Sequence, residues 1–109
     1  LYGASFEQFI GMELRTYLSY TRSKDPLTFW RTTHGFEVDY LIGDHTAMEV
    51  KATGKVSEKH IKGLKALSEE NKLKKMFLVT HDPIATKKEG IHAMHWESFL
   101  KELWMKKMI

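Results

Sequence analysis

The stretch "FEVDYLIGDHTAMEVKAT", residues 36–53, decides the fold because it predicts two short strands joined by a tight turn. Residues 37–42 and 47–51 form the strands, and "GDHT" supplies the turn between them. Three carboxylates and one ammonium nevertheless interrupt these strands: Glu37, Asp39, Glu49 and Lys51. The hairpin that defines the sheet is therefore also the first candidate for a functional site.

Alternation of side chains along a strand predicts where these charges lie. Val38, Tyr40 and Ile42 are expected on one face of the first strand, with Met48 and Val50 on the matching face of the second. If the two apolar faces coincide, the four charged residues converge on the other side of the sheet.

Carboxylates gathered in this way repel one another and raise their own pKa values, so a positive partner is needed. Lys51 offers one charge, and a divalent cation such as Mg²⁺ or Mn²⁺ offers two and prefers carboxylate oxygens. Such an ion, held by one carboxylate from each strand, can bind a phosphate and lower the pKa of a bound water. The alternative is a solvent-facing sheet surface with ordinary cross-strand ion pairs. A short Asp…Glu-x-Lys string occurs often by chance, so taken alone it favours this alternative.

The rest of the chain predicts helices and strands around this hairpin. Apolar residues at helical spacing indicate helices at residues 5–20, 54–71 and 96–108, and strands are expected at residues 27–32, 74–81 and 89–96. The expected order is helix, three strands, helix, two strands, helix (αβββαββα). That order implies an α/β domain in which helices pack on the faces of a mixed sheet.

Length and composition indicate one globular domain covering residues 1–109. The chain has no cysteine and no apolar run long enough to span a membrane, which fits a cytoplasmic protein. Because it begins at Leu1, we expect it to be a piece of a longer protein. Net charge is +3, and residues 51–75 carry eight lysines against three glutamates, which suits either a phosphate-rich partner or a solvated helix surface.

Several motifs together resemble a known nuclease group. An acidic residue in the first helix (Glu7), Asp39 in the second strand and "EVK" (Glu49 to Lys51) in the third are similar to the PD-(D/E)XK nuclease superfamily. One branch is more closely resembled by four sequence segments, "SFEQFIGMEL", "FWRTTHGFEVDYLI", "MEVKAT" and "KGLKAL". That branch is the C-terminal domain of unknown function in predicted prokaryotic AAA-type ATPases. The proline that precedes the aspartate in the superfamily name is replaced here by Val38.

The resemblance implies a restriction-endonuclease-like three-layer fold and a role for each matching position. Asp39, Glu49 and the carbonyl of Val50 would bind Mg²⁺ or Mn²⁺, and Lys51 would be the catalytic lysine. Glu7 would be an outer-sphere or water-binding carboxylate. Glu37 matches the branch's "EVD" and would be either a further ligand or a partner for Arg31.

The resemblance also implies DNA as the partner and an ATPase module that this chain lacks. The residues expected to contact phosphates are Lys55, Lys59, Lys62 and Arg31, although Arg31 fits equally well as a cation at the sheet edge. Two functions stay open. One is Mg²⁺-dependent hydrolysis of phosphodiester bonds, and the other is a catalytically inactive DNA-binding or partner-docking module of an AAA-type ATPase.

Overall fold

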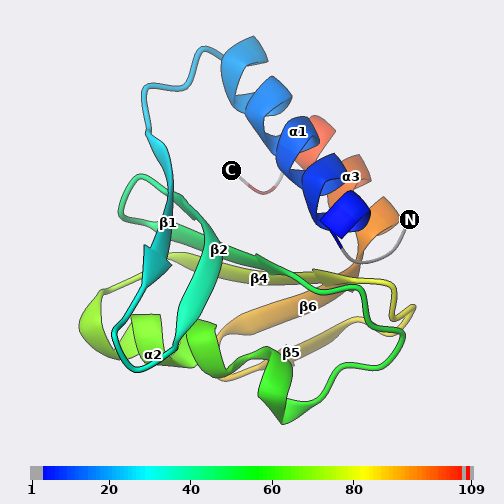
Figure 1. Ribbon diagram of the computed structural model, residues 1–109. Coiled ribbons are helices and arrows are strands. Elements are labelled where there is room, and N and C mark those ends of the chain that lie inside the picture. Colours follow the sequence, from blue (N-terminus) through cyan, green and yellow to red (C-terminus); the bar gives the residue numbers. More distant parts are fainter. Residues whose placement is uncertain (1–3, 107, 109) are drawn as a thin grey trace.

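The structure is a computed structural model that describes residues 4–106 and 108. It is an α/β fold in three layers, with one mixed sheet between two helical layers (Figure 1). Its helices are α1 (Ala4–Tyr20), the 3₁₀ helix η1 (Glu58–His60), α2 (Lys62–Glu70) and α3 (Trp96–Trp104). Its strands are β1 (Leu27–Arg31), β2 (Glu37–Ile42), β3 (Thr46–Val50), β4 (Lys75–Thr80), β5 (Thr86–Lys88) and β6 (Ile91–His95). None of the described helices is both long and apolar enough to cross a membrane.

The sheet has the strand order β1-β2-β3-β4-β6-β5. The first three strands are antiparallel neighbours, β3, β4 and β6 run parallel, and β5 pairs antiparallel with β6. A parallel neighbour requires a crossover, and η1 with α2 supplies it between β3 and β4. The mixed α/β sheet expected from the sequence is therefore confirmed.

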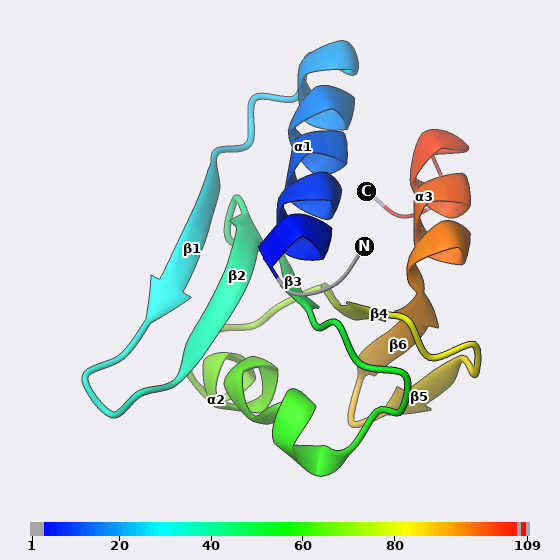
Figure 2. The same cartoon turned by 45° about the vertical axis from the view of Figure 1, so that its right-hand side comes forward.

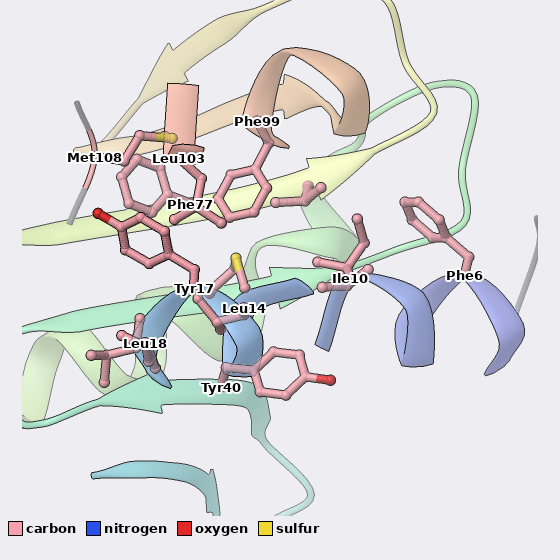
Figure 3. Packing of buried hydrophobic residues seen from close by; sticks show 14 residues of the cluster. Phe6, Ile10, Leu14, Tyr17, Leu18, Tyr40, Phe77, Phe99, Leu103 and Met108 are labelled. Atoms are coloured by element: carbon pink, nitrogen blue, oxygen red, sulfur yellow. The ribbon is translucent and has the colours of Figure 1, made fainter. Parts of the chain in front are cut away.

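Two hydrophobic clusters hold the layers together. Helices α1 and α3 cover one face of the sheet and α2 covers the other (Figure 2). The side of α1 that faces the sheet carries Phe6, Ile10, Leu14 and Tyr17, and Figure 3 shows them packed with Phe99 of α3 and Phe77 of β4. On the other face, Leu64 and Leu67 of α2 pack against residues that include Ala47, Leu78 and Ala93. Strand β4 is buried on both faces, as its continuous apolar run predicts.

Two local expectations differ from the structure. The predicted helix over residues 54–71 is divided into η1 and α2, which begins only at Lys62. Strand β5 was not expected, because three exposed residues, two of them lysines, carry no strand pattern. It forms because the Glu89–Gly90 turn, where both residues have positive φ, returns the chain alongside β6.

Strict alternation along β2 is the expectation that the structure overturns. The β1–β2 pairing joins Thr28 to Leu41 but Trp30 to Val38, so Phe29 alone faces both Asp39 and Tyr40. This is a β-bulge, in which β2 has one extra residue. The side chains of β2 before the bulge therefore point to the opposite faces from those that strict alternation predicts. Val38 accordingly packs in the α2-side cluster, whereas Tyr40 and Ile42 pack under α1.

Candidate active site

The site begins where the pairing of β2 with β3 stops. The two strands pair through their main chains from the Ile42–Thr46 pair to the Tyr40–Met48 pair. Beyond that point side chains take over the hydrogen bonds. The N–H of Asp39 donates to Oε1 of Glu49 at 2.6 Å, and the N–H of Val50 donates to Oδ2 of Asp39 at 2.8 Å. The bulge thus brings the two carboxylates into the gap between the strands, facing each other.

Glu49 is the most buried charged residue of this group, with 3% of its surface exposed. Burial, and then the neighbouring charge of Asp39, raise the pKa of its carboxyl to about 8, although Lys51 opposes the shift. Nζ of Lys51 lies 3.3 Å from Oε2 of Glu49. Burial lowers the pKa of Lys51, but the charge and hydrogen bond of Glu49, together with the charges of Asp39 and Glu37, outweigh burial, so the net pKa is raised.

Glu7 approaches the pair from α1, whose N-terminal end lies over the end of β3 (Figures 1 and 2). Its placement follows from the burial of Phe6 and Ile10 on the sheet-facing side of the helix. Partial burial of its carboxyl, the charge of Asp39 and a hydrogen bond between the two carboxyl groups raise the pKa of Glu7. The helix therefore adds a third carboxyl group to the two from the sheet.

Glu37 lies at the rim of the site. It is opposite Arg31 in the β1–β2 register, and Nε of Arg31 lies 3.5 Å from its Oε2. Both side chains are more than half exposed, and the Arg31 guanidinium also stacks over the Phe29 ring. Of the two roles considered for Glu37, the ion pair with Arg31 is the one whose geometry the structure shows.

The three lysines expected to contact phosphates are all exposed but lie in different surroundings. Lys55 lines a groove of about 710 Å³ beside β5, together with Lys87 and Lys88. Lys62, the first residue of α2, lines a separate hollow of about 400 Å³ beside Phe36. Lys59 lies on η1.

His60 is a neighbour of the site that the sequence analysis missed. Its pKa is lowered by burial and by the positive charges of Lys59 and Lys51, so the imidazole lies within electrostatic reach of the Lys51 ammonium. Nδ1 accepts a 2.9 Å hydrogen bond from the N–H of Ser57, which leaves Nε2 to carry the proton. The only sequence signal is the Ser57-x-x-His60 spacing of a capping turn, which does not distinguish His60 from the lysines around it.

A close backbone contact fixes the second helix beside the site. A Cβ on Gly63 would lie 2.1 Å from the carbonyl oxygen of Glu37, so only glycine lets α2 approach β2 this closely. The contact is two residues from Asp39 in sequence. It holds the start of α2, which follows η1 and His60 directly in sequence, against β2.

The donors of the site suit a hard divalent cation. Among residues 4–106 and 108, no three histidine, aspartate or glutamate side chains form a ready metal cage. The implied set needs only the carboxylates of Asp39 and Glu49 and the carbonyl of Val50. Each carboxylate oxygen keeps a second lone pair after it accepts one N–H bond. The N–H of Val50 points toward Asp39, and in a strand the carbonyl of the same residue points to the same edge. The residues therefore fit Mg²⁺ or Mn²⁺.

The family of the chain follows from a match over residues 2–99, a span that contains every residue of the site described above. The matching family is DUF4143, described as a domain of unknown function. Neither a curated protein nor a solved structure matches the chain. Because the match covers more than half of its length, the chain belongs to the DUF4143 family.

Proposed function

We propose that this domain binds DNA and hydrolyses phosphodiester bonds with Mg²⁺ or Mn²⁺, as its resemblance to the PD-(D/E)XK superfamily implies. One observation carries the proposal: the carboxylates of Asp39 and Glu49 lie together in the gap between β2 and β3, where Glu49 accepts from the main-chain N–H of Asp39 and Asp39 accepts from that of Val50. Carboxylates are seldom buried without a charged partner, and here Lys51 is that partner. A bound divalent ion would polarise the phosphate and lower the pKa of an attacking water.

The chain's own residues would divide the remaining work. Lys51 carries a fixed positive charge, so its contribution is to stabilise the negative charge that develops on the phosphate. Glu7, with its raised pKa, can orient a water and take its proton. In the reaction the water oxygen bonds to phosphorus, one phosphorus–oxygen ester bond breaks, and the leaving oxygen gains a proton.

Nicking of supercoiled plasmid tests this proposal. Wild type should convert supercoiled to open-circular DNA in about 5 mM Mg²⁺ or Mn²⁺. It should lose this activity in EDTA. Lys51→Met and Asp39→Asn should reduce the rate at least ~100-fold, in keeping with the loss of one electrostatic stabiliser. Lys72→Met, which removes an exposed lysine after α2, is the matched control. Equal nicking by Lys51→Met and wild type would show that the activity does not come from this site.

A second function is favoured by the same hydrogen bonds. Asp39 and Glu49 both satisfy main-chain N–H groups, a structural role that they fulfil without any metal. We therefore keep as an alternative a catalytically inactive module that binds DNA or docks a partner within an AAA-type ATPase. Salt-dependent DNA binding by wild type, without nicking in either metal, would support this alternative.

A further inference from the structure

A further hollow lies beside the carboxylates, between α1 and β2. Its volume is about 560 Å³, and it is lined by Glu7, Gln8, Met12 and Arg15 of the helix and by Tyr40 of β2. Glu7 belongs both to this hollow and to the acidic site. The hollow and the acidic site therefore adjoin at Glu7.

The tyrosine in this hollow is fixed by the same bulge that positions the acidic site. Asp39 and Tyr40 are the two bulge residues, so one feature directs the carboxylate into the gap and the phenol under α1. A Cβ on Gly11 would lie 2.1 Å from the Tyr40 hydroxyl, so glycine makes room for the ring. The hydroxyl donates to the carbonyl of Glu7 at 3.4 Å, and Figure 3 shows it at the margin of the cluster.

The far end of the hollow is positive and apolar. Arg15 is exposed, and among the described residues no carboxylate lies within 4.0 Å of its guanidinium. Met12 beside it exposes 66% of its surface, so its thioether side chain is available for contact. A free guanidinium next to an exposed apolar surface matches the two parts of a nucleotide, its phosphate and its base or sugar.

We propose that this hollow is a subsite for the nucleotide next to the one whose phosphate lies at Glu49 and Lys51. Arg15 binds the phosphate of that neighbouring nucleotide, and Met12 contacts its sugar and base, while the buried Tyr40 ring forms the floor of the hollow. The contact is with a backbone phosphate and apolar surfaces, so it is independent of base sequence. This inference rests on the proposed function, because it assigns the same substrate to an adjoining surface.

The experiment measures binding of a fluorescein-labelled 12-nucleotide DNA, single-stranded and duplex, by anisotropy in EDTA at three salt concentrations. Arg15→Ala should weaken binding about 5- to 10-fold and reduce the slope of log K against log salt by about one phosphate contact. Arg15→Lys should restore the slope but only part of the affinity, because it keeps the charge without the planar fork. In plasmid nicking, Arg15→Ala should raise KM and leave kcat within about twofold of wild type.

Two variants complete the design. Met12→Asp should weaken binding through loss of the apolar contact and repulsion of the phosphate, whereas Lys101→Ala on α3 removes an exposed cation that does not line the hollow. Binding and salt slope that are equal in Arg15→Ala and wild type would overturn the subsite alone. Failure of wild type to bind either DNA would overturn the proposed function, and the subsite with it.

Discussion

The main-chain N–H of Asp39 lies 2.6 Å from Oε1 of Glu49, so a side chain from β3 occupies the position that a strand carbonyl normally takes. Asp39 does the same for β3, because its own carboxylate accepts from the main-chain N–H of Val50. Sheet pairing and the acidic site are therefore one structure. A substitution at either carboxylate changes the stability of the sheet as well as the chemistry.

The first prediction separates these two effects at Glu49. Glu49→Ala leaves the N–H of Asp39 without an acceptor in a buried gap, which should cost about 1–3 kcal/mol of unfolding free energy. Glu49→Gln keeps a carbonyl oxygen in place and should retain most of the stability. Urea unfolding of both variants at one pH measures the difference. Equal losses would mean that the hydrogen bond to Asp39 does not stabilise the sheet.

The second prediction concerns metal binding without catalysis. With a Kd of about 1 mM, 10 mM Mg²⁺ or Mn²⁺ should stabilise the folded protein by about 1.4 kcal/mol and raise Tm by several degrees. Asp39→Asn preserves an acceptor for Val50 but lacks the negative charge, so its Tm should not respond to metal. Thermal unfolding with and without EDTA makes the comparison. A shift of the same size in Asp39→Asn would place the metal elsewhere.

The third prediction is a fall in stability of the metal-free protein as pH rises. The pKa of Glu49 is about 8 in the folded state and 4.5 as its ordinary value, so the folded state binds the proton more tightly. This contribution is complete below pH 4.5 and is lost as pH rises through about 8, at roughly 1.4 kcal/mol per pKa unit at most. Urea unfolding between pH 5 and 9 should show the fall in wild type.

Glu49→Gln, which cannot titrate at this position, is the control and should have a flatter profile over the same range. Metal should counteract the fall, because binding releases the Glu49 proton and becomes tighter as pH rises. An unfolding free energy that is constant or increasing between pH 5 and 8 in metal-free wild type would contradict the raised pKa.

The sequence predicted most of the fold because hydrophobic periodicity determines which residues are buried. The sheet-facing residues of α1 and the buried strand β4 follow directly from that pattern. The bulge at Asp39 and Tyr40 could not be predicted, since it depends on how β1 pairs with β2 and leaves no mark in β2 itself. Convergence of Asp39, Glu49 and Lys51 was expected from simple alternation. The structure reaches it by a different route, through the bulge and the end of the β2–β3 pairing.

The surroundings of the site were harder to foresee than its centre. Lys51 was found from strand alternation and Glu7 through a resemblance, whereas His60 depends on where η1 comes to lie beside the sheet. The start of α2, directly after η1, is held against β2 by the close contact of Gly63 with Glu37, a tertiary contact between residues distant in sequence. Local propensity gives no information about such a contact.

The fourth prediction tests this contact. Gly63→Ala would normally stabilise a helix by up to ~1 kcal/mol, but here the new methyl group meets a backbone carbonyl that cannot rotate away. The net effect should be a loss of about 1–3 kcal/mol, as in other overpacked sites. Gly54→Ala is the control, because a Cβ there meets nothing within 4 Å. Equal stability of the two variants in urea would show that α2 does not need glycine at this position.

The fifth prediction uses His60 to report the charge of Lys51. Because the Lys51 ammonium lowers the pKa of His60, Lys51→Met should raise it, and ¹H–¹⁵N or ¹H–¹³C titration of the imidazole measures the change directly. Lys62→Met is the matched control: it also removes a lysine close to His60 in sequence, but Lys62 is not among the charges that shift His60. The rise should occur without substrate or metal, so it is independent of any catalytic activity. If the pKa of His60 responds equally to both variants, it is set by the basic surface in general and not by Lys51 in particular.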